Sequence, residues 1–103
     1  MSTGEPASLG YDETQHAWTS TRALTGPTPP RVVSRRPAEH VSDEADSGWT
    51  VGNGDEAGLG PDEFEWSPVS ELTDRFPDLD AVFRSGSGTW RWSAAYGRYV
   101  NAP

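Results

Sequence analysis

Carboxylates are the most numerous side chains of this sequence that could do chemistry. Nine Asp or Glu residues and no Lys or Arg lie between residues 39 and 65. They could bind Ca²⁺ or Mg²⁺, or act as an acid and base pair. A calcium-binding loop needs acids at alternate positions followed by Gly, and that pattern is missing. Nothing in the spacing distinguishes two of the acids as a catalytic pair. We therefore predict solvated acidic loops without a metal site.

Nucleophilic catalysis has equally little support. The sequence contains no Cys, which removes thiol chemistry, disulfides and thiolate metal sites. It also lacks the Gly-x-Ser-x-Gly pattern of a nucleophile on a strand-to-helix turn. The two histidines, His16 and His40, follow a tail and a short strand that ends in proline, so we expect solvated imidazoles. We predict that the protein is not an enzyme and needs no cofactor.

The charge balance favours a protein partner over a nucleic acid. The formal net charge is −8, which repels phosphate and attracts a basic protein surface. A simpler alternative is that the acidity only keeps the protein soluble. The sequence shows neither a secretory signal nor an apolar run of about 18 residues, the length that a membrane helix needs. We therefore expect a cytoplasmic protein without a membrane or nucleic-acid partner.

Aromatic residues are the expected source of stability, because the chain has five Trp, three Tyr and three Phe. Trp and Arg are also the residue types enriched at the energetic centres of protein interfaces. They alternate in Trp90-Arg91-Trp92, where a strand would place both indoles on one face and Arg91 on the other. We expect at least one of these indoles in the core, which leaves Arg91 as a contact candidate.

The elements that must position these residues follow from periodicity and turn signals. Residues 1–15 read as a flexible tail, and residues 16–103 as one domain. We predict strands at residues 16–24 and 31–36, which could pair as a hairpin across a proline-rich loop, and another at residues 49–51. Residues 56–65 read as a surface loop.

One helix has a clear start signal in the second half of the chain. Ser67 is the expected N-cap and Pro68 the first helical residue, and Pro77 should end the helix. Residues 78–84 fit either a helical turn or a strand. Residues 89–93 and 98–100 predict a C-terminal β-hairpin. The fold class is therefore α+β: a small, mostly antiparallel sheet with one main helix on one face.

Two acidic segments, Asp46-Ser47-Gly48-Trp49 and Gly54-Asp55-Glu56, resemble the signature of the immunity protein 33-like family. This is a bacterial family associated with polymorphic toxin systems. The similarity covers about residues 17–100 and includes Arg36-Pro37 and the closing hairpin. The chain departs from the family pattern in two places. Arg36 meets Pro37 without acids between them, and Thr50-Val51 replace an aromatic residue.

The resemblance implies an immunity-type protein that binds and neutralises a toxin domain, which would have a basic surface. The predicted partner contacts are Asp46, Asp55, Glu56 and Arg91. The predicted structural motif is Ser47, Gly48, Trp49 and Gly54. In this hypothesis Trp49 fixes two acidic turns and does not itself make the contact. The alternative from a different class is a non-enzymatic structural or accessory module of a phage or a larger assembly. No oligomeric state is predicted.

Overall fold

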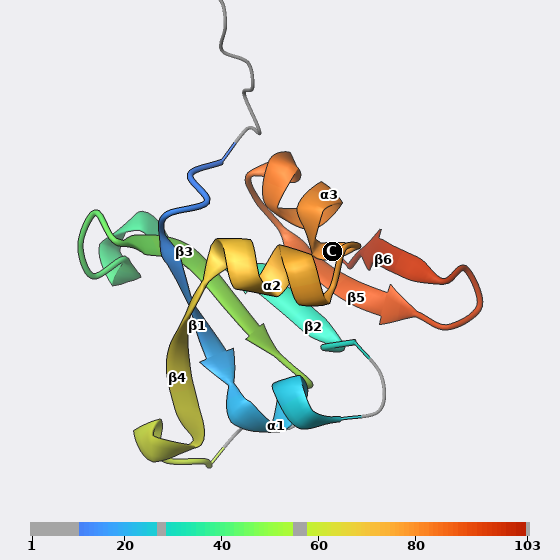
Figure 1. The fold of residues 1–103 in the computed structure, drawn as a ribbon, viewed down its shortest axis with the longest axis horizontal. Helices are drawn as coiled ribbons and strands as arrows, with labels where there is room; N and C mark the ends of the chain where they lie inside the picture. The colour runs from blue at the N-terminus through green and yellow to red at the C-terminus, as the bar shows by residue number, and fades with distance from the viewer. Residues whose placement is uncertain (1–10, 27–28, 55–57, 103) are drawn as a thin grey trace, which may run out of the picture.

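The computed structural model describes residues 11–26, 29–54 and 58–102. Its secondary structure confirms the predicted α+β class, with a mixed and mostly antiparallel sheet (Figure 1). The elements in chain order are β1 (His16–Ser20), α1 (Thr21–Thr25), β2 (Val32–Arg35), η2 (Ala38–His40), β3 (Asp46–Gly52), η3 (Pro61–Glu63), β4 (Phe64–Pro68), α2 (Val69–Arg75), α3 (Leu79–Ser85), β5 (Thr89–Ser93) and β6 (Arg98–Asn101).

The strand order in the sheet is β4-β1-β3-β2-β5-β6. β1 runs parallel to β3, and the other four pairings are antiparallel. The predicted hairpin between residues 16–24 and 31–36 is wrong, because β3 lies between β1 and β2. The first of these strands is also shorter than predicted. It ends at Ser20, and residues 21–25 form α1.

The C-terminal hairpin was predicted correctly. β5 and β6 pair with Trp92 opposite Tyr99 and Ser93 opposite Arg98. Trp90 and Trp92 are partly buried and pack against the core, whereas Arg91 is exposed. The alternation expected of a strand therefore places the two indoles toward the core and Arg91 away from it.

The structure differs from the sequence prediction at two points before α2. The predicted loop at 56–65 ends earlier than expected, because β4 begins at Phe64 and forms one edge of the sheet. Ser67 lies in β4 and does not cap the helix, so that prediction was wrong. Pro68 is the N-cap residue, and α2 starts at Val69. The ambiguous segment 78–84 is helical: Asp78 is the N-cap of α3, which has seven residues, as α2 does.

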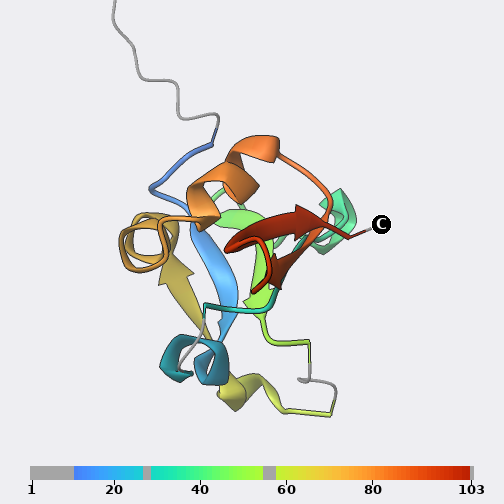
Figure 2. The ribbon, with the colours of Figure 1, turned by 90° about the vertical axis from the view of Figure 1, so that its right-hand side faces the viewer.

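One face of the sheet carries the core. α2 crosses in front of the strands in Figure 1 and lies to one side of them in Figure 2. On the side of α2 that faces the sheet, Val69 and Leu72 are buried and Phe76 packs against the core. The buried apolar residues that form the core are Ala17, Val33, Trp49, Val51, Val69, Leu72, Leu79, Val82, Phe83 and Tyr99.

The packed part of the chain includes residues before β1. The Tyr11 ring lies edge-on to Phe83, with 5.6 Å between ring centroids. Its hydroxyl donates a hydrogen bond of 2.6 Å to Asp80 on α3. Burial, followed by this hydrogen bond, raises the pKa of Tyr11 to about 12. Tyr11 thus connects α3 to a segment that lies upstream of residue 16, where the sequence placed the start of the domain.

Candidate functional site

The first acidic segment forms a bulge at the start of β3. His16 is opposite Asp46 and Trp18 is opposite Thr50, so two steps along β1 match four along β3. Gly48 has a φ of +86° inside this irregularity, a conformation that side chains with a Cβ rarely adopt. Such bulges redirect the side chains that follow them. Here the residue that follows is Trp49, which faces the core.

Asp46 is a buried centre of hydrogen bonding. Arg36 binds its two carboxylate oxygens from two guanidinium nitrogens, at 2.6 and 2.9 Å. The backbone N–H groups of Ser42 and Gly48 each donate a further bond of 2.8 Å. Burial of the carboxyl opposes ionisation, but these donors outweigh it and lower the pKa of Asp46 to about 2. Asp46 therefore stabilises the turn as a carboxylate.

The other residues of this segment also have internal roles. Trp49 is only 2 % exposed, and its ring lies 5.5 Å from that of Phe83. Ser47 accepts a hydrogen bond of 3.2 Å from the Trp49 N–H. The Arg35 guanidinium lies over the indole, with its Cζ 5.7 Å from the ring centroid. The burial of Trp49 agrees with the hypothesis that it fixes the turn.

The second acidic segment lies at the other end of β3. Gly54 follows the strand and lies beside Val32 at the start of β2. Asp55 and Glu56 lie outside the described residues. β3 has seven residues, which at roughly 3.3 Å per residue separates its ends by about 20 Å. The two acidic segments therefore belong to opposite ends of one strand and do not form one cluster.

No known family model, curated protein or solved structure matches this chain. The likeness to the immunity protein 33-like family accordingly stays a prediction.

Arg91 lies on the face of the sheet opposite α2. Residues that pair across neighbouring strands share a face, so the register can be followed from β4 to β6. The residues that it places on this face, which we call the open face, are Trp66, Trp18, Thr50, Ser34, Val32, Arg91 and Val100. Four strand spacings of about 4.8 Å place Arg91 about 19 Å from Trp66.

An aromatic cluster lies at the β4 end of the open face. The Trp18 ring stacks on Phe64 at 5.4 Å between centroids and contacts the Trp66 ring at 4.8 Å. Trp66 remains 44 % exposed. The loop predicted at residues 56–65 includes Phe64 and Glu65, so the sequence prediction does not contain the cluster. The alternation of Phe64-Glu65-Trp66, with rings two residues apart, is the signal that could have revealed it.

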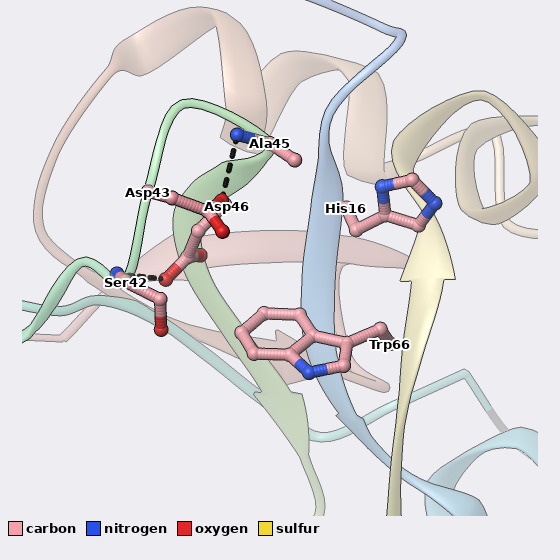
Figure 3. Close-up of a pocket in the computed structure, with 6 residues that line it drawn as sticks. All are labelled: His16, Ser42, Asp43, Ala45, Asp46 and Trp66. Atoms are coloured by element: carbon pink, nitrogen blue, oxygen red, sulfur yellow. Dashed lines mark hydrogen bonds between the residues drawn. The ribbon is translucent and has the colours of Figure 1, made fainter.

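A hollow of about 320 Å³ opens beside Trp66 (Figure 3). Its lining comes from β1, β4, the first residue of β3 and the turn that precedes β3. The lining residues are His16, Ser42, Asp43, Ala45, Asp46 and Trp66. The open face thus combines an exposed indole with a concave site, and interface hot spots have that combination.

Within residues 11–26, 29–54 and 58–102, no group of three or more His, Asp or Glu side chains is arranged to hold a metal ion. In the same part of the chain, none of the helices has the length and apolar character that crossing a bilayer requires.

Proposed function

We propose that this protein is an immunity-type protein that binds a bacterial toxin domain and inhibits it in a one-to-one complex. The observation that carries the proposal is the exposed Trp66 indole, which lies on the open face in contact with Trp18, which itself stacks on Phe64. An exposed indole at the edge of a sheet loses water favourably when a partner covers it. The resemblance to the immunity family supplies the class of partner.

Charge supports a partner with a basic surface. The net charge is −8, and the exposed Asp43 lines the hollow beside Trp66. A basic partner would be drawn to this surface and held by pairs at its rim. Asp55, Glu56 and Arg91 remain proposed contacts. Asp46 is omitted from the proposed contacts because it is 4 % exposed and its oxygens bind groups of its own chain.

The direct test is co-expression with the toxin domain encoded next to its gene. Growth should be rescued, and the purified pair should form a complex in which inhibition saturates at one equivalent. Trp66→Ala should weaken binding at least tenfold, as expected for an interface anchor. Tyr96→Ala is the matched control, because Tyr96 is 72 % exposed but lies in the β5–β6 turn. The proposal fails if no complex forms at micromolar concentration and growth is not rescued.

The structural or accessory module remains a second candidate because of the sheet edges. β4 and β6 are the outer strands, and an outer strand can pair with another chain. Self-association that rises with concentration, without any toxin partner, would favour this candidate. Sedimentation velocity at several protein concentrations distinguishes it from a monomer that binds a toxin.

A further inference from the structure

The hollow beside Trp66 has the chemistry of a site for a cationic side chain. The electron-rich face of an exposed indole attracts a guanidinium or an ammonium group. Asp43 supplies a carboxylate at the same place, and one of its oxygens accepts a 2.9 Å hydrogen bond from the Ala45 N–H. Figure 3 shows the indole of Trp66 facing the turn that carries Asp43 across β1.

The charges around the hollow leave it net negative. Asp46 lines it, but its charge is compensated by Arg36, with 2.6 Å between the nearest charged atoms. Asp43 forms no such pair within the described part of the chain. A cation that enters the hollow would therefore meet one uncompensated carboxylate beside an aromatic face.

The indole already contacts one cation of its own chain. Arg36 lies over the Trp66 ring, with its Cζ 5.8 Å from the centroid. This distance is within the range of a cation–π contact. Trp66 is nevertheless 44 % exposed and lines the hollow, so part of the side chain is open to a second cation.

We propose that the hollow receives an arginine side chain of the toxin partner, with the guanidinium stacked on Trp66 and paired with Asp43. The inference rests on the proposed function, because it names the group by which the partner is recognised. Arginine fits better than lysine because its planar guanidinium stacks on an aromatic ring and binds a carboxylate through two N–H groups. The volume of about 320 Å³ lies at the low end of the range for small-molecule pockets and has room for one long side chain.

The test uses the full chain without any partner. N-acetylarginine amide is titrated into ¹⁵N-labelled protein, and the indole N–H signal of Trp66 is followed by NMR. N-acetylcitrulline amide, which has nearly the same shape but no charge, is the control ligand. We expect saturable binding of the arginine probe in the range of about 1–10 mM, and at least tenfold weaker binding of citrulline. Equal shifts with both probes would overturn the inference.

Variants then locate the site. Trp66→Leu should abolish the probe-dependent shifts of neighbouring backbone amides, and Trp66→Phe should retain part of the affinity because it keeps an aromatic face. Asp43→Asn should weaken binding about fivefold while its amide oxygen still accepts the Ala45 N–H. Asp62→Asn, at an exposed acid in η3, and Tyr96→Ala should leave the affinity unchanged. Unchanged affinity in Asp43→Asn and Trp66→Phe, together with a retained fold, would also contradict the inference.

The two proposals can fail separately. Selective binding of the arginine probe with no toxin complex would leave the cation site in place and overturn the toxin function. If a tight toxin complex forms and its affinity is the same for Trp66→Leu and the natural chain, the toxin function stands and the role assigned to this hollow is overturned.

Discussion

At the scale of single residues, an acid that the sequence offers as a partner contact has a structural role. The Asp46 carboxylate accepts four hydrogen bonds, two from Arg36 and two from backbone N–H groups. Burial of an unpaired carboxylate would cost several kcal/mol, and these donors offset that cost. A residue that reads as a contact candidate in the sequence therefore holds the turn in which it lies.

The first prediction is a loss of stability in acid that belongs to Asp46. Its folded pKa of about 2 lies below the ordinary value of 3.8, so the native state binds the proton more weakly than the unfolded chain. The contribution of this group is full above pH 4 and disappears as the pH falls toward 2. At about 1.4 kcal/mol per pKa unit it amounts to about 2 kcal/mol. Urea unfolding at several pH values measures it.

Asp46→Asn should remove this pH dependence and cost about 2–4 kcal/mol at neutral pH, because Arg36 then stays partly buried without its counter-charge. Arg84→Ala is the control, since the Arg84–Asp80 pair is 46 % and 39 % exposed. Breaking that exposed pair should cost less than about 1 kcal/mol. If Asp46→Asn and Arg84→Ala lower the free energy of unfolding by similar amounts, the Asp46 hydrogen bonds do not stabilise the turn more than an exposed ion pair does.

The second prediction concerns the two indoles with opposite environments. Trp49 is 2 % exposed and lies in the core, so Trp49→Ala should cost about 3–5 kcal/mol through lost burial and a residual cavity. Trp66 is 44 % exposed, so Trp66→Leu should cost less than about 1.5 kcal/mol. Thermal and urea unfolding measure both. A small loss of stability in Trp49→Ala would mean that the core repacks and fills the cavity left by the indole.

At the scale of elements, local signals located most strands and the C-terminal hairpin but missed the pairing of β1, β2 and β3. Alternation and turn residues predicted the C-terminal hairpin, and Pro77 marked the end of α2 within two residues. The parallel neighbour of β1 is β3, which lies about 30 residues away along the chain. Nothing local encodes such a pairing, because it depends on how several strands bury one apolar face together. The same limit explains the wrong hairpin between β1 and β2.

The candidate site also depends on contacts between residues far apart in the sequence, which local signals do not encode. Arg91 was placed on the correct face because strand alternation alone decides that. Trp66 was missed, since its importance depends on two strands that bring Trp18 and Phe64 beside it. Asp46 was predicted as a contact, and nothing in the sequence indicates its pairing with Arg36, which follows β2. Burial of a carboxylate in such a pair is a tertiary property.

The third prediction tests the bulge in β3. A Cβ at Gly48 would lie 2.5 Å from Arg35 Nε, and the φ of +86° is unfavourable for alanine. Gly48→Ala should therefore cost about 2–3 kcal/mol, of which about 1–2 kcal/mol is backbone strain. Gly97→Ala is the control, because Gly97 also has a positive φ, +65°, but a Cβ there meets nothing within 4 Å. If Gly48→Ala and Gly97→Ala lower the free energy of unfolding equally within error, the contact with Arg35 has no role.

At the scale of the whole molecule, the sheet divides the chemistry between its faces. The helices α2 and α3 cover one face and build the core there, while the open face carries aromatic residues at β4 and Arg91 at β5. The net charge of −8 acts over the whole surface and does not need a defined contact. The face would thus decide which partner fits, and the charge would decide how fast the partner arrives.

The last prediction follows from this division and concerns the rate at which the proposed toxin partner binds. Raising the ionic strength from about 0.01 to 1 M shortens the Debye length from about 30 to 3 Å, which screens attraction between the acidic surface and a basic partner. The association rate constant should fall at least tenfold, while the dissociation rate constant changes little. Trp66→Ala should show the reverse, because its contact forms only after docking. Stopped-flow fluorescence measures both rates, and an association rate that ignores salt would mean that the net charge does not guide the partner.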